Sequence, residues 1–265
     1  MDPDAEPVRR ERSAPPAWEK EQWLDEGSLR DEAEKAARRA AHDDEQPRGR
    51  RKSTELAPEV AADLADAAPA SRQARYQERL TSAADALDRG RYGDARRMVQ
   101  PVLRDLPDLA FGHEIAGLAL YRLGQWRKAV GELESARQLT GTVQHHAVLM
   151  DCYRALKRFH DVDALWKELR EASPEPALMA EGRIVAAGAL ADRGDLSGAL
   201  KVMQKGAEAP KVKKPRDYHL RQWYVLGDLY DRSGDVIKAR RFFSLVAEFD
   251  REFADVRERL RTLGR

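Results

Sequence analysis

The sequence has a single cysteine, almost no net charge and no long apolar run, and each absence excludes a class of protein. Cys152 alone cannot form an intramolecular disulfide or a cysteine metal cluster. A formal net charge of +1 creates no field that draws the whole molecule to nucleic acid or acidic membranes. No stretch approaches eighteen apolar residues, and the start MDPDAEPVRRERS lacks the apolar core of a secretory signal. We therefore expect a soluble, cytoplasmic protein with no membrane insertion.

The sequence also lacks the common motifs of catalysis. It has no glycine-rich phosphate loop with lysine, no HExxH and no paired CxxC. His145 and His146 are adjacent, so on a helix they point about 100° apart and cannot share a metal ion. We predict no catalytic residue, no cofactor and no metal site. The Ala, Arg and Asp content hints at a high-GC bacterial genome.

The first 70 residues differ in composition from the rest of the chain. They hold seven of the thirteen prolines, and their apolar residues are mostly alanine. Such a segment buries too little surface to offset its chain entropy, so we expect a largely disordered N-terminal arm. Two stretches in it have helical patterns, near residues 28–41 with Ser28 as N-cap and near 58–67 with Pro58 in the first turn.

From residue 71 onward the sequence repeats. Tyr92, Trp126 and Phe159 each follow a short break, at spacings of 34 and 33 residues, and Leu196 and Val236 continue the series at 37 and 40. A small or modest residue lies three positions after each of them. A period of this length with helical apolar patterning predicts pairs of helices that must stack to bury their apolar faces.

The best copy of this pattern lies at residues 223–243 and alternates bulky with tiny side chains. Small residues let two helix backbones approach closely, whereas large residues fill the space around that contact. The copy consists of Trp223, Leu226, Gly227, Tyr230, Gly234, Ala239 and Phe243.

These residues resemble the tetratricopeptide repeat. The resemblance implies an all-α fold, an α-solenoid of stacked antiparallel helix pairs. We expect five units in residues 71–250, at about 76–109, 110–142, 143–179, 180–219 and 220–250, and a C-terminal capping helix at 251–265. The first unit fits poorly and has Pro101 inside its second helix, where a lost hydrogen bond costs about 3 kcal/mol or forces a kink. The third unit has Lys157 where the others have a turn glycine.

The resemblance also implies a concave groove, lined by the first helix of each unit, that binds segments of protein partners. One subset of the family clamps a C-terminal carboxylate, but here the corresponding positions hold Leu80, Ala84, Ile115, Gln144 and Val148, so that function is not expected. The candidate groove residues are those at outward positions of these helices: Gln77, Glu114, Leu118, Tyr121, Arg122, Asp151, Arg154, Tyr224, Asp228, Asp231 and Arg232.

Two features outside the groove carry further hypotheses. Trp18, Trp23 and Leu24 are too few to form a core, so they are a candidate anchor for a partner, a segment that folds back into the chain's own groove, or incidental aromatics in a disordered arm. The basic stretches RGRRK (48–52) and KVKKPR (211–216) indicate RNA or ribosome contact as an alternative, although no aromatic residues are interleaved with them.

The sequence therefore favours a non-enzymatic scaffold that holds protein partners of unknown identity, with an RNA- or ribosome-associated factor as the alternative. A third reading is an enzyme centred on Cys152, which with His145 could form a thiol–imidazole pair. Against it, Cys152 occupies the position that Ala119 and Ala189 have in neighbouring units, where a buried cysteine acts as a small apolar residue.

Overall fold

The computed structural model describes residues 56–206, 212 and 214–264, and within these it contains twelve helices. Trp18, Trp23, Leu24, the expected helix near 28–41 and the RGRRK stretch lie outside the described residues. Ten of the helices form consecutive antiparallel pairs, and one further helix flanks the pairs at each end. The all-α solenoid expected from the sequence is thus confirmed.

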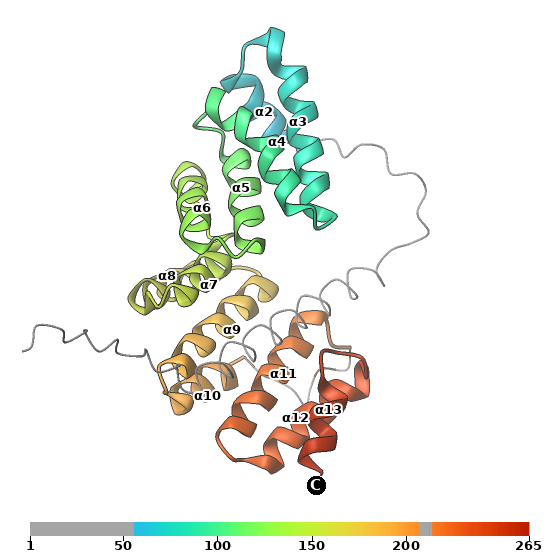
Figure 1. Ribbon diagram of the computed structural model, residues 1–265. Coiled ribbons are helices and arrows are strands. Elements are labelled where there is room, and N and C mark those ends of the chain that lie inside the picture. The colour runs from blue at the N-terminus through green and yellow to red at the C-terminus, as the bar shows by residue number, and fades with distance from the viewer. Residues whose placement is uncertain (1–55, 207–211, 213, 265) are drawn as a thin grey trace, which may run out of the picture.

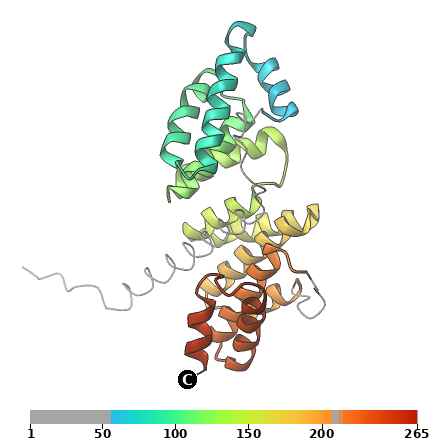
Figure 2. The same ribbon diagram turned by 90° about the vertical axis from the view of Figure 1, so that its right-hand side faces the viewer.

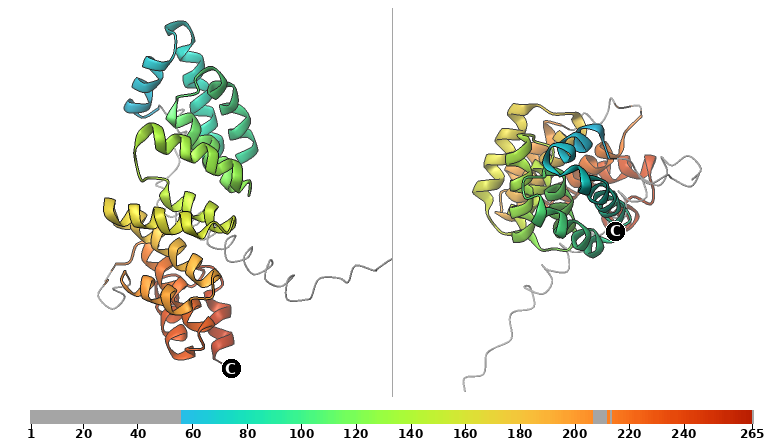
Figure 3. Two further views of the ribbon diagram at one scale, coloured as in Figure 1. Left: turned by 90° about the vertical axis from the view of Figure 1, so that its left-hand side faces the viewer. Right: turned by 90° about the horizontal axis from the view of Figure 1, so that it is seen from above.

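The helix pairs follow one another in sequence order along an elongated stack (Figures 1 and 2). Seen along its length, the described helices overlap around one axis (Figure 3). The pairs are α3 (Ala70–Asp88) with α4 (Tyr92–Asp105), α5 (Ala110–Arg122) with α6 (Trp126–Thr140), α7 (His146–Ala155) with α8 (Phe159–Ala172), α9 (Pro176–Asp192) with α10 (Leu196–Gln204), and α11 (Asp217–Arg232) with α12 (Val236–Phe249); α2 (Pro58–Ala67) precedes them and α13 (Val256–Leu263) follows.

The first pair begins earlier than the sequence indicated. Helix α3 starts at Ala70, not near residue 76, and it follows directly on Pro69, which is its N-cap residue. Helix α4 runs unbroken from Tyr92 to Asp105 with Pro101 inside it. Its buried residues are Ala95, Val99 and Val102, so packing against α3 keeps this helix continuous despite the missing N–H.

Small residues allow the two helices of a pair to meet. A Cβ added to Gly227 of α11 would lie 2.8 Å from Cε1 of Phe243 in α12, and one added to Gly117 of α5 would lie 2.6 Å from Cγ of Leu133 in α6. Around the first contact, Trp223 and Phe243 are almost completely buried. The alternation of bulky and tiny residues in the sequence therefore reflects a close approach of two backbones with large side chains packed around it.

Both ends of the stack are covered by single helices. Leu64 of α2 is buried with Leu80 of α3 in the core of the first pairs. At the other end, Phe253 and Val256, just before and at the start of α13, are buried with Trp223. These contacts shield apolar faces that a terminal pair would otherwise expose to water.

The turn inside each pair places one residue in the left-handed region. Gly90, Gly124, Gly194 and Gly234 have φ of 72°, 71°, 84° and 81° there, and Lys157 has φ of 57° at the equivalent place in the third pair. The Lys157 N–H donates to the Arg154 carbonyl at 2.9 Å, as the Gly234 N–H donates to that of Asp231. The third pair therefore makes the same turn as the others with a residue that is less suited to it.

Replacing Lys157 by glycine should stabilise the protein by about 0.5–1 kcal/mol. The left-handed conformation costs a non-glycine residue about 1–2 kcal/mol, and the more flexible unfolded chain of the variant offsets part of the gain. Urea unfolding of the full chain measures the change. Gly194→Ala is the matched control, because its Cβ meets no atom within 4 Å and only the backbone conformation is altered. This control should lose about 1 kcal/mol, and a loss of stability in Lys157→Gly would contradict the argument.

A second pair of substitutions separates packing from helix propensity. Gly131→Ala in α6 introduces a Cβ with no atom within 4 Å, so the better helix propensity of alanine should stabilise the protein by about 0.5–1 kcal/mol. Gly227→Ala gains the same propensity but overlaps the Phe243 ring, so we expect a net loss of about 1–2 kcal/mol. The two midpoints of chemical denaturation should move in opposite directions. Equal shifts would show that the approach of α11 and α12 is not the constraint we describe.

Candidate functional site

The predicted groove residues lie on one row of helices, α3, α5, α7 and α11, and we call the outward side of these helices and α9 the first-helix face. The predicted residues differ in exposure. Gln77, Arg122 and Arg232 are exposed; Glu114, Leu118, Tyr121, Asp151, Arg154, Asp228 and Asp231 are half-buried; Tyr224 is buried.

A polar network connects three successive first helices at the centre of this face. The Tyr121 hydroxyl in α5 donates to Asp151 Oδ2 in α7 at 2.7 Å. The Arg154 guanidinium, one turn further along α7, lies 3.0 Å from Asp151 and donates to Asp192 Oδ2 in α9 at 3.1 Å. The network therefore brings together three of the predicted residues and adds Asp192, which the sequence analysis did not name.

Two further contacts between polar side chains extend the network on either side. His145 Nε2, just before α7, lies 3.6 Å from Glu114 Oε1 in α5. Arg221 of α11 lies 2.7 Å from Glu181 Oε2 of α9. Burial raises the pKa of the Glu181 carboxyl, and the charge of Arg221 opposes this shift. Each neighbouring pair of first helices from α5 to α11 is thus joined by at least one charged contact.

The prediction that Tyr224 lines an open groove is wrong. Tyr224 is 6% exposed because the chain around α13 covers it. Its hydroxyl donates to Asp255, and its ring centroid lies 5.8 Å from that of Phe253. Burial, together with the hydrogen bond to Asp255, raises the pKa of the Tyr224 hydroxyl.

Asp228 and Asp231 of α11 are also engaged by the chain itself. Arg259 of α13 donates to Asp228 and lies 3.4 Å from Asp231, and its guanidinium stands 5.2 Å from the Phe243 ring centroid. Burial raises the pKa of the Asp228 carboxyl, although Arg259 favours the ionised form. The α11 portion of the first-helix face is therefore occupied by α13, and its open portion runs over α3, α5, α7 and α9.

Most of the residues in these contacts that the sequence did not indicate are partners of the predicted residues. A usable signal exists, because the partner follows about one repeat later with complementary chemistry, as in Tyr121 and Asp151 or Asp228 and Arg259. Applied from the predicted residues, this rule finds His145, Asp192, Asp255 and Arg259. Glu181 and Arg221 pair with each other, so neither is the partner of a predicted residue.

His146 and Cys152 are both buried inside the fold. His146 is 2% exposed, and its Nε2 lies 3.1 Å from Glu168 Oε2; burial lowers its pKa against the effect of that carboxylate. Cys152 is fully buried and clusters with Leu120 and Ala129, which fits a packing role. Among the described residues, no group of three or more His, Cys, Asp or Glu is placed to hold a metal ion.

Comparison with solved structures identifies the architecture. The chain is similar to the crystal structure of a thermophilic TPR protein from Thermus thermophilus, with a TM-score of 0.54 and 16% sequence identity over 71% of this chain and 98% of the other. The fold is a tetratricopeptide-repeat solenoid. Neither family models nor curated protein sequences gave a match. No helix in the described part of this solenoid has the length and apolar character needed to cross a membrane.

Replacing Arg259 by methionine should destabilise the solenoid by about 1–3 kcal/mol at neutral pH. Methionine retains an apolar stem over Phe243, but the half-buried Asp228 carboxylate loses its charged hydrogen-bond donor. A protonated Asp228 needs no cation, so the difference from the wild type should shrink as the pH falls through the raised pKa of Asp228.

Denaturant unfolding at several pH values measures this difference. Arg257→Met on the same helix is the control, because Arg257 is exposed and pairs only with the exposed Glu252 among the contacts described, so its effect should stay below about 0.5 kcal/mol. A difference that does not change on acidification would exclude the proposed role of the Asp228 charge.

Proposed function

We propose that this chain is a non-enzymatic cytoplasmic scaffold that binds an extended or helical segment of a protein partner on the first-helix face of α3, α5, α7 and α9. The observation that carries the proposal is the contrast between the two ends of this face. At α11 the chain's own α13 covers it, whereas Gln77 of α3 and Arg122 of α5 are exposed. The tetratricopeptide-repeat fold commonly serves protein interaction, which supports this assignment.

The chemistry of the open face fits a mixed polar and apolar ligand. Leu118 and Tyr121 of α5 contribute apolar surface, and Arg122 next to them contributes a charge. The Tyr121–Asp151–Arg154 network stands beside these residues and is only half-buried. Because Asp151 and Arg154 are half-buried and paired with each other, a partner segment would bind beside this network on Leu118, Tyr121 and Arg122 and leave its ion pairs in place.

Affinity capture of the full-length protein from its native lysate, followed by mass spectrometry, tests the proposal. The capture is divided into samples with and without nuclease and is repeated with Gln77→Arg combined with Arg122→Glu. Both substitutions lie on the exposed part of the face. We expect a discrete protein partner that survives nuclease and whose recovery falls at least fivefold with the double variant.

Lys201→Glu is the matched control, because Lys201 is an exposed cation on the second helix α10 and lies off the first-helix face. Its recovery of the partner should equal that of the wild type. Loss of the captured protein with nuclease would favour RNA or ribosome contact through the basic stretches. Equal recovery of the partner with all three proteins would exclude the first-helix face as the binding surface.

A further inference from the structure

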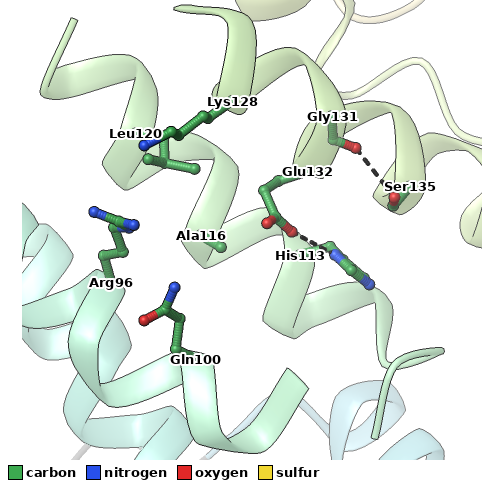
Figure 4. A pocket seen from close by; sticks show the side chains of 9 residues that line it. All are labelled: Arg96, Gln100, His113, Ala116, Leu120, Lys128, Gly131, Glu132 and Ser135. Atoms are coloured by element: carbon green, nitrogen blue, oxygen red, sulfur yellow. Dashed lines mark hydrogen bonds and ion pairs between the residues drawn. The ribbon is translucent and has the colours of Figure 1, made fainter. Parts of the chain in front are cut away.

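A pocket lies outside the first-helix face, where the first two pairs meet between α4, α5 and α6 (Figure 4). Its volume of about 370 Å³ falls at the lower end of the range of roughly 300–1,000 Å³ that is usual for ligand sites. Ala116 and Leu120 of α5 provide an apolar floor. The size and the floor suit an apolar side chain of a bound segment.

The walls of this pocket carry positive charge without a matching carboxylate. Arg96 of α4 and Lys128 of α6 both line the pocket, and Gln100 lies below Arg96 in Figure 4. Within the described part of the chain, Arg96 forms no ion pair, and the contact of Lys128 is a hydrogen bond of 3.4 Å to Gln125. These two cations and the Gln100 amide are available to a ligand.

The one carboxylate in the pocket is already paired. Glu132 Oε2 lies 2.7 Å from His113 Nδ1, and His113 Nε2 lies 2.7 Å from the Pro107 carbonyl oxygen. Both ring nitrogens face acceptors, an arrangement that is satisfied fully only by the doubly protonated imidazolium. The hydrogen bond to Glu132 correspondingly raises the pKa of His113. Even without a charge on His113, the two cations Arg96 and Lys128 outnumber the single carboxylate Glu132, so the pocket keeps an excess of positive charge.

A segment of the same chain has the complementary chemistry. Residues 18–26, WEKEQWLDE, contain two tryptophans and a leucine together with Glu19, Glu21, Asp25 and Glu26 against the single Lys20. The first-helix face suits it less, because there Arg154, Arg221 and Arg259 are already paired with carboxylates. Charge complementarity therefore favours the pocket over that face.

We propose that residues 18–26 dock in this pocket, with an apolar side chain on the Ala116–Leu120 floor and with carboxylates against Arg96 and Lys128. Residues 27–55 connect the segment to the described chain. Because the segment and the pocket belong to one chain, docking is intramolecular, so a contact that is weak between separate molecules is sufficient. The docked segment contacts both of the first two helix pairs.

Photo-cross-linking in the full-length protein tests this docking. The photoreactive residue p-benzoylphenylalanine replaces Gly131, which lines the pocket and has open space around its Cα, and in a control protein it replaces the exposed Ile237 of α12. After irradiation of the monomeric protein, we expect mass spectrometry to map intramolecular cross-links from position 131 to residues 18–26. Position 237 should give no such cross-link.

A charge exchange then tests the recognition itself. Arg96→Glu with Lys128→Glu should lower the cross-link yield at least fivefold, and combining them with Glu19→Lys, Glu21→Lys and Asp25→Lys should restore it. Circular dichroism verifies that each variant remains helical. The proposal is overturned if position 131 forms no cross-link to residues 18–26 or if the cross-links occur only between two molecules. It is also overturned if the cross-link yield stays the same after the charge reversal.

Discussion

The packing of the second and fifth pairs depends on the close approach of their two helices, whereas the third pair has Met150 at the equivalent position. Gly227 faces Phe243 and Gly117 faces Leu133 at the same sequence separation, and in both pairs a Cβ on the glycine would overlap the larger side chain. The distance between the two helices therefore depends on one small residue and one large one. Because each pair stacks on the next, an error in this distance would move every helix beyond it, which explains why the bulk of these residues is so regular in the sequence.

The residues that form the contacts between successive pairs differ from one junction to the next. A Cβ on Gly112 would lie 2.7 Å from Leu103, and one on Gly182 would lie 2.1 Å from Leu169, so glycine brings the second pair close to the first and the fourth close to the third. The equivalent positions before the third and fifth pairs hold His145 and Gln222. Gln222 is buried and accepts a hydrogen bond from Arg183 at 3.1 Å. Apolar packing thus dominates two junctions, whereas polar side chains take part in the other two.

The helix pairs could be predicted from the sequence because local patterning determines them. The apolar period, the turn glycines and the Trp223 to Phe243 pattern all act within about one repeat, and Lys157 adopts the turn that its position required. The candidate surface was less predictable, because exposure depends on the neighbouring element. Tyr224 occupies an outward position on α11, but Phe253 and Asp255 cover it from beyond the last repeat. The pocket at Arg96 and Lys128 likewise arises from two pairs and has no local motif.

The C-terminal helix indicates which groups a segment bound on the first-helix face, as proposed here, would have to present. Helix α13 and the residues before it present a buried aromatic ring from Phe253, an acceptor for Tyr224 from Asp255, and a cation for Asp228 and Asp231 from Arg259. An external segment on α5 and α7 would meet comparable groups, since Tyr121, Asp151 and Arg154 offer a hydroxyl, a carboxylate and a guanidinium. The apolar contacts would supply most of the affinity, whereas the order of the charges along the helices would determine the register of the segment.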